Sequence, residues 1–265
     1  MKKEKSLSIC SIRGFMTGEK DKKTDKTAAK ENWFHSAKVQ RFLGGGVLER
    51  LGIQTLQNVQ MTVLQGHKAK NDIKLINKVR RARRSLLTVD EYFLILSLAK
   101  TFAKKEGAMI EIGTYQGCSA RLMCEVKGEK KLYVCDTYEG LPESHTKDRG
   151  VHKTAQYACS LDAVSKFMEG FPNVQFIKGF FPNSAAGIIP DDERFGFAHI
   201  DVDLYEGTLE GIRWLYPRMI PGGVIISHDY SVLSGVKHAV NELAEELASA
   251  VVIELPTTQA MIIKV

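Results

Sequence analysis

The chain has 265 residues, of which 44% are hydrophobic and 26% charged, with 22 glycines and 7 prolines. These fractions exclude collagen-like, low-complexity and wholly disordered chains. The net charge of +6 would suit a polyanionic partner, but residues 1–31 carry +4 and residues 67–84 carry +7, which leaves −5 for the rest of the chain. Because the basic excess is confined to the N-terminal third, we expect no nucleic-acid groove through a catalytic core.

The apolar stretches are short, as in Phe93–Leu96, whereas a membrane-spanning helix needs about 20 apolar residues. We therefore predict no transmembrane segment, and the N-terminus shows no readable secretory signal. The five cysteines form no C-x-x-C pair and no metal-ligand spacing, which indicates reduced thiols in a cytoplasmic protein. We expect Cys118, Cys124 and Cys135 to be small buried hydrophobic residues.

The first third of the chain divides into two parts. Residues 1–31 predict a basic flexible tail, because their charges alternate without an apolar face. Residues 32–106 predict a helical and irregular extension, irregular over residues 32–66, with Gly44–Gly46 as a turn or hinge.

Two helices are expected in the second half of this extension. From Asp72 onward, apolar residues recur at helical spacing (Ile73, Ile76 and Val79). Thr88 then fits an N-cap, and Glu91 completes a capping box before a helix over Tyr92–Ala103.

Residues 107–265 alternate short apolar runs with helical stretches and predict one catalytic domain. The expected strands are Ala108–Gly113, Lys131–Thr137, Val174–Phe181, Gly196–Asp203, Gly223–His228, Val251–Leu255 and Met261–Val265. The expected helices are Ser119–Val126, Ala155–Gly170, Gly207–Tyr216 and Val236–Leu247. Since a short link joins the last two strands, they should pair antiparallel. The order predicts a three-layer α/β/α fold with a Rossmann-like, seven-stranded, mainly parallel sheet whose last strand is antiparallel.

Three motifs fall at expected strand ends, where such sheets bind ligands. Glu111–Ser119 ends a strand, turns through two glycines and opens a helix whose N–H groups can bind an anion, while Glu111 suits a cationic ammonium group. The glycine spacing is not that of a dinucleotide site. Asp136 ends the next strand, where an acid accepts hydrogen bonds from a ribose diol.

The third motif is His199–Thr208, in which Asp201 and Asp203 alternate on an expected strand and so face one side. Two like charges so close favour a bound cation or a shared proton. His228 and Asp229 close the following strand, and with Asp201 they form an oxygen-rich set with one imidazole that suits a divalent ion.

Together, Glu111–Ser119, Asp136–Pro142, Ile200–Thr208 and His228–Tyr230 resemble the class I S-adenosylmethionine-dependent methyltransferases, and among them the macrocin-type (TylF-like) O-methyltransferases. That family methylates sugar hydroxyls on antibiotics and related glycosides. The resemblance covers about Arg80–Val265 and implies a seven-stranded sheet with an antiparallel last strand. It also implies S-adenosylmethionine as cofactor and a divalent metal, Mg²⁺ being the ion expected.

The resemblance implies a role for each matching residue. Asp136 would hold the ribose, the turn through Gly179 and Phe180 would border the adenine, and Asp201 would be metal ligand and base. From the chemistry of methyl transfer we expect Asp203 to be a supporting acid. The methionine end of the cofactor would be held by Glu111, Gly113, Thr114, Gly117 and Ser119. Asp229 and the residue before it would complete the metal site. The family places an aspartate at that preceding position, whereas this chain has His228, and imidazole favours softer metals than Mg²⁺.

These observations predict an O-methyltransferase acting on a hydroxyl of a sugar, glycoside or related small molecule. Pro142–Val151 is the expected substrate lid. Two alternatives stay open: a regulatory protein that binds S-adenosylmethionine without transferring its methyl group, and a nucleic-acid or membrane-docking surface at Lys68–Arg84. A solvated helix face is the simpler explanation of that basic run. The acceptor and the oligomeric state, a homo-oligomer included, are not fixed by the sequence.

Overall fold

The computed structural model describes residues 47–247 and 249–265. The chain divides into a unit of residues 1–31 and a unit of residues 32–265, and all described residues belong to the second. The expected tail, residues 1–31, and the expected turn at Gly44–Gly46 lie outside the described residues.

A seven-stranded sheet with the order β3-β2-β1-β4-β5-β7-β6 forms the centre of the fold. The strands are β1 (Ala108–Ile112), β2 (Leu132–Asp136), β3 (Val174–Lys178), β4 (Phe195–Ile200), β5 (Met219–Ser227), β6 (Ala250–Glu254) and β7 (Ala260–Lys264). The pairs among β1 to β5 are parallel, and β7 runs antiparallel to both of its neighbours. This arrangement confirms the predicted Rossmann-like α/β fold. The order reverses beside β1, so a cleft at its carboxyl end is expected.

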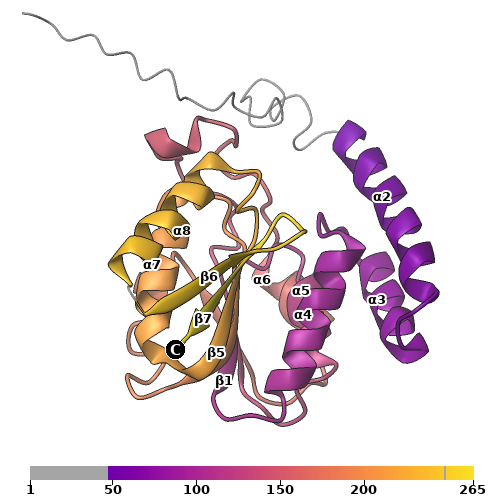
Figure 1. Cartoon of the computed structure of the whole chain (residues 1–265), viewed down its shortest axis with the longest axis horizontal. Helices are drawn as coiled ribbons and strands as arrows, with labels where there is room; N and C mark the ends of the chain where they lie inside the picture. The colour runs from indigo at the N-terminus through magenta and orange to yellow at the C-terminus, as the bar shows by residue number, and fades with distance from the viewer. Residues whose placement is uncertain (1–46, 248) are drawn as a thin grey trace, which may run out of the picture. The chain divides into compact units, whose positions relative to one another are not determined.

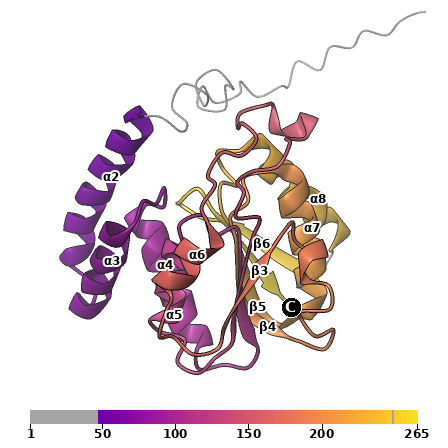
Figure 2. The same ribbon diagram turned by 180° about the vertical axis from the view of Figure 1, so that it is seen from behind.

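Helices cover both faces of the sheet (Figures 1 and 2). They are α2 (Val47–Gln65), α3 (Lys70–Ala82), α4 (Val89–Phe102), α5 (Cys118–Cys124), α6 (Leu161–Phe167), α7 (Tyr205–Leu215) and α8 (Ser234–Glu246). One core packs α7 and α8 against the face that carries Ile110 and Ile112, and the other packs α3, α4 and α5 against the face of Met109. The alternation along β1 is what a strand buried on both faces requires.

The expectation of irregular structure across residues 32–66 is wrong for Val47–Gln65, which form α2. The helix packs on α3 and α4 through the buried side chains of Met61 and Leu64, while Val59 and Val63 stay exposed. Because apolar residues lie on both sides of α2, the sequence shows no single apolar stripe there. The expected buried face of α3 (Ile73, Ile76 and Val79) and the capping box of Thr88 and Glu91 are confirmed.

The helix expected over Ala155–Gly170 spans only Leu161–Phe167. Ala155 and Tyr157 have φ of 62° and 65°, which a helix cannot contain. Ala155 N–H donates to the carbonyl of Leu141 at 2.8 Å, so this segment pairs with the loop after β2. Ser160 caps the shorter helix by accepting from Ala163 N–H.

Cys118, Cys124 and Cys135 are buried free thiols, as expected. In the part of the chain that the structure describes, no helix is both long enough and apolar enough to cross a membrane.

Candidate functional site

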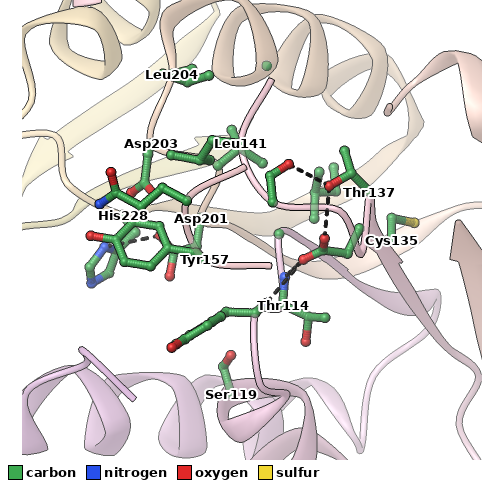
Figure 3. A pocket seen from close by; sticks show the side chains of 18 of the residues that line it. Thr114, Ser119, Cys135, Thr137, Leu141, Tyr157, Asp201, Asp203, Leu204 and His228 are labelled. Carbon is green, nitrogen blue, oxygen red and sulfur yellow. Dashed lines mark hydrogen bonds and ion pairs between the residues drawn. The ribbon is translucent and has the colours of Figure 1, made fainter. Parts of the chain in front are cut away.

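A pocket lies at the carboxyl ends of β1, β2, β4 and β5, where the strand order reverses. Gly113 follows β1, Asp136 ends β2, Asp201 follows β4 and His228 follows β5, and all four line the pocket. In Figure 3, the side chains of Asp201, Asp203 and His228 gather on one side of it, while Thr114, Thr137 and Ser119 lie elsewhere along its wall. The motifs that the sequence singled out therefore meet in one cavity.

The loop after β1 crosses directly over the chain that leaves β4. Gly113 has φ of 81°, and a Cβ placed on it would stand 1.9 Å from the carbonyl oxygen of Asp201. Only glycine fits this crossing, because a side chain would collide with backbone as well as strain the turn. The crossing fixes Asp201 against the glycine loop.

Asp136 holds that loop in place from β2. Its Oδ2 accepts from Thr114 N–H at 2.7 Å and Tyr115 N–H at 3.0 Å, and its Oδ1 accepts from Tyr138 N–H at 2.7 Å. Burial raises the pKa of the Asp136 carboxyl above its usual value, although these three N–H groups favour the charged form. The carboxylate lines the pocket and shapes it at the same time.

Glu111 differs from its expected place, because it does not line the pocket. Its side chain is fully buried; Oε2 accepts from the Thr114 hydroxyl at 2.6 Å, and Oε1 lies 3.0 Å from Nδ1 of His199. In this position the carboxylate orients the Thr114 hydroxyl. His199 is a buried residue of β4 whose imidazole contacts this carboxylate.

Of the other residues expected to bind the cofactor, most line the pocket and one lies outside its lining. Ser119, Gly179 and Phe180 line the pocket with Gly113 and Thr114, whereas Gly117 does not. Gly117 is the N-cap of α5 with φ of 81°, and a Cβ there would meet Met168 Cε at 2.9 Å. Its requirement for glycine comes from the turn and from packing on Met168.

Asp201, His228 and Asp229 form a compact cluster of possible metal ligands, with one ligand atom from each within 4.8 Å of the others. Nδ1 of His228 lies 3.3 Å from Asp201 Oδ1 and 3.1 Å from Asp229 Oδ2. The imidazole is buried, and neither ring nitrogen makes a well-aligned hydrogen bond with the described residues. Such buried polar atoms call for a partner, and a cation between the two carboxylates would supply it.

A residue from the N-terminal extension completes this cluster from behind. Glu91, on α4, is buried, and its Oε2 lies 3.4 Å from Nε2 of His228. The same carboxylate accepts from Thr88 N–H at 2.7 Å and from the Thr258 hydroxyl at 2.6 Å. The sequence predicted Glu91 only as half of a capping box, and its contact with His228 depends on how α4 packs beside β5. No local sequence signal reveals such a contact.

The ionisable groups of the cluster influence one another strongly. Burial lowers the pKa of the His228 imidazole, but Asp201, Asp229 and Glu91 together raise it well above its usual value. Burial likewise raises the pKa of Glu91, yet His228 and the hydrogen-bond donors bring it to about 2. Without a bound cation the imidazole is therefore itself the positive charge among three carboxylates.

Asp203 lines the same pocket, but the position of its side chain has a different structural cause from the one expected. β4 ends at Ile200, so strand alternation does not place Asp201 and Asp203 on one side. The chain turns instead, with φ of 60° at Asp203. Burial, together with the charges of Asp229 and Asp201, raises the pKa of the Asp203 carboxyl well above its usual value, and it shares a hydrogen bond with Asp229.

The segment expected as a lid, Pro142–Val151, is anchored by Asp148, a residue that the sequence did not single out. Asp148 is buried; its Oδ1 accepts from Tyr205 N–H at 2.7 Å, and its Oδ2 accepts from His145 N–H at 2.8 Å. The first contact places a carboxylate at the positive N-terminus of α7. The pocket wall at Leu141 and Pro142 is thus tied to the helix that follows Asp203.

Comparison with known proteins agrees with this fold. The structure of the O-methyltransferase NovP superposes with a TM-score of 0.63 at 18% identity, covering 82% of this chain and 99% of that one. The model of the macrocin-O-methyltransferase (TylF) family matches residues 99–253, more than half of the chain. The chain therefore belongs to the macrocin-O-methyltransferase family.

Two curated relatives are similar over part of the chain. The 8-demethyl-8-(2,3-dimethoxy-alpha-L-rhamnosyl)-tetracenomycin-C 4'-O-methyltransferase of Streptomyces olivaceus is 30% identical over 142 residues, 48% of this chain and 54% of the relative. The demethyldecarbamoylnovobiocin O-methyltransferase of Streptomyces niveus is 26% identical over 152 residues, 51% of this chain and 57% of the relative. The chain thus matches little more than half the length of either relative.

Proposed function

We propose that this protein is an S-adenosylmethionine-dependent O-methyltransferase that methylates a hydroxyl of a sugar, glycoside or related small molecule, assisted by a divalent cation. Membership of the macrocin-O-methyltransferase family supports the reaction class. One observation on this chain's own residues gives the proposal its main support. The Asp201–His228–Asp229 cluster opens into the same pocket as the glycine loop and Asp136.

The pocket suits the proposed cofactor on its own chemistry. Gly113 lets the loop run close over the chain at Asp201, and Gly113, Thr114 and Ser119 line the pocket on this side. Asp136 presents a carboxylate at the end of β2, where a ribose diol can donate to it. We assign Gly113, Thr114, Ser119, Asp136, Gly179 and Phe180 to cofactor binding, and give Glu111 and Gly117 supporting roles behind the pocket wall.

The cluster also suits a divalent cation. Asp201 and Asp229 offer carboxylate oxygens, and Nδ1 of His228 points between them. Histidines that ligate metals commonly donate their other N–H to a carboxylate, and Glu91 Oε2 stands 3.4 Å from Nε2 of His228 in that position. Mg²⁺ is the ion that the family resemblance leads us to expect, whereas a mixed set of two carboxylates and one imidazole suits Mn²⁺ or Zn²⁺ better.

For this reaction the protein must position and deprotonate an alcohol, because an alcohol is a weak nucleophile near neutral pH. When bound, S-adenosylmethionine supplies the methyl group and a divalent cation lowers the pKa of the acceptor hydroxyl. Asp201, at the edge of the pocket, accepts the hydroxyl proton as general base. Asp203 shares a hydrogen bond with Asp229 and keeps that carboxylate oriented, and the carboxylate of Glu91, 3.4 Å from Nε2 of His228, orients the imidazole.

The test is methyl transfer from radiolabelled S-adenosylmethionine to a panel of glycosides, catechols and lipid-linked glycans, read by product mass spectrometry. We expect transfer to at least one hydroxyl acceptor, lost on chelation and restored by Mn²⁺ or Mg²⁺. Binding of S-adenosylmethionine without transfer to any acceptor would favour the regulatory alternative. Transfer that survives exhaustive chelation would remove the cation from the proposal.

A further inference from the structure

A groove rich in arginine lies between α2 and the segment that joins α3 to α4. Its lining residues are Ile53, Gln54, Gln57, Asn58, Arg80, Arg81, Arg83, Arg84, Ser85 and Leu86, and we refer to it as the arginine groove. No aspartate or glutamate is among them. Within the described part of the chain, none of the four guanidinium groups forms an ion pair. Four positive charges within five residues are an unusual arrangement, because like charges close together repel.

The arginine groove continues into the central pocket. Arg84, Ser85 and Leu86 line both cavities, and Leu87 lines the central pocket next to them. The same segment runs on into α4, whose Glu91 faces His228. The shared residues place the arginine groove next to the pocket that holds Asp201 and His228.

Two of the arginines are held by the protein itself. Arg83 donates to the carbonyl oxygens of Ala163 at 2.6 Å and Gln116 at 3.5 Å. Arg80 donates to side-chain oxygens of Asn77, Gln57 and Asn58 at 3.1 to 3.5 Å. These acceptors are neutral, so they hold the guanidinium groups in place without balancing their charge.

The other two arginines keep donors for a ligand. Nε of Arg84 is buried and has no hydrogen-bond partner among the described residues, and the side chain of Arg81 is exposed. A buried N–H without a partner costs free energy, which binding of an acceptor group would recover. Guanidinium groups match the paired oxygens of phosphate, and several of them suit a group that carries more than one negative charge.

Further basic residues lie along α3, where Lys70 and Lys74 are exposed and Lys78 pairs with Glu125. None of these three lysines lines the arginine groove or the central pocket. The arginine groove is the part of this basic surface that adjoins the central pocket, which favours a small anionic ligand there, and binding of a polyanion along α3 is an outcome that the test below distinguishes.

We infer that the methyl acceptor carries a phosphate or diphosphate group, as in a glycosyl phosphate or a nucleoside diphosphate sugar, and that Arg81 and Arg84 bind this group while the sugar hydroxyl lies at the Asp201–His228–Asp229 cluster. The inference rests on the proposed methyltransferase function and narrows its substrate class. It also assigns anion binding to Arg81 and Arg84, which lie at the C-terminal end of the basic run Lys68–Arg84.

The test titrates the full chain with inorganic pyrophosphate by calorimetry, with S-adenosylhomocysteine present. We expect saturable binding that Arg81→Gln and Arg84→Gln each weaken about 10-fold or more, since each removes charge-assisted hydrogen bonds. Lys74→Gln is the matched control, because it removes an exposed charge from α3 outside both cavities and should leave pyrophosphate binding within about twofold. Thermal unfolding and S-adenosylhomocysteine binding report that each variant is folded.

Several outcomes overturn the inference. The first is that the wild type does not bind pyrophosphate, and the second is that Arg84→Gln binds pyrophosphate as tightly as the wild type does. The third is that Arg84→Gln loses S-adenosylhomocysteine binding while its pyrophosphate binding stays intact. Tighter binding of a short single-stranded RNA or of anionic phospholipid vesicles, with the same dependence on Arg81 and Arg84, overturns it in favour of a macromolecular surface.

Methyl transfer separates this inference from the proposed function. In kinetics, Arg84→Gln should raise KM for phosphorylated sugars at least about 10-fold more than it raises KM for neutral glycosides. Transfer to neutral glycosides without any pyrophosphate binding overturns the inference and leaves the proposed function standing. Arginine-dependent binding of pyrophosphate with no methyl transfer to any acceptor contradicts the proposed function and leaves the anion site standing.

Discussion

Replacing Glu91 by glutamine keeps the side chain's size and removes the charge that faces His228. The carboxylate accepts from Thr88 N–H at 2.7 Å and from the Thr258 hydroxyl at 2.6 Å, both in a buried position. Hydrogen bonds to a charged group contribute about 1.5–3 kcal/mol and neutral ones about 0.5–1.5 kcal/mol. Weakening two such bonds should lower the free energy of unfolding by about 2 kcal/mol.

The same substitution should also change the cation affinity of the proposed site, because Glu91 contacts His228. Outer partners of metal-ligating histidines affect metal affinity about 10- to 100-fold when they are changed, so Glu91→Gln should weaken Mn²⁺ binding by that factor. Calorimetry and electron paramagnetic resonance of Mn²⁺ measure binding without a turnover assay, and urea denaturation measures the stability.

Asp90→Asn is the matched control, since Asp90 is also an acid in the first turn of α4 and accepts from Gln60 at 2.6 Å. It should leave Mn²⁺ affinity unchanged. Equal Mn²⁺ affinity in the wild type and Glu91→Gln, or equal weakening in both variants, would refute the reasoning that Glu91 acts through His228.

Three further predictions concern the pocket and its supports. Gly113→Ala places a Cβ 1.9 Å from the Asp201 carbonyl and should cost more than about 4 kcal/mol in urea denaturation. Gly170→Ala, with φ of 87° and open space around it, should cost only about 1 kcal/mol, and equal losses would show that the close approach is unimportant. Asp148→Ala leaves two N–H groups without their acceptor and should speed tryptic cleavage within its own segment, whereas unchanged proteolysis would contradict its anchoring role. Of the described cysteines, Cys159 is the least buried, so maleimide labelling followed by peptide mapping should find it modified first, and earlier modification of a buried cysteine would contradict the packing.

The sequence predicted the catalytic fold well, because its signals there are local. Continuous apolar runs marked the buried strands, and Thr88 with Glu91 marked the start of a helix. The polar residues at strand ends could be grouped into one site, because parallel strands bring their carboxyl ends to one edge. Those signals do not depend on how distant segments pack.

The remaining features depend on packing between distant segments. Nothing near Glu111 indicates that Thr114 and His199 occupy its carboxylate, since the second contact crosses from β1 to β4. The contact of Glu91 with His228 likewise crosses from α4 to β5. The helix α2 was missed because its apolar residues do not form one stripe, and apolar side chains such as Val59 and Val63 remain exposed on it.

The central claim is that Asp201 takes part in methyl transfer at the cation cluster, and the rate of Asp201→Asn tests it most directly. The measurement compares initial rates of transfer from labelled S-adenosylmethionine for the wild type, Asp201→Asn and the exposed control Asp162→Asn. We predict a loss of at least about 100-fold for Asp201→Asn, with S-adenosylhomocysteine binding and the rate of Asp162→Asn unchanged. Undiminished transfer by Asp201→Asn would contradict the account.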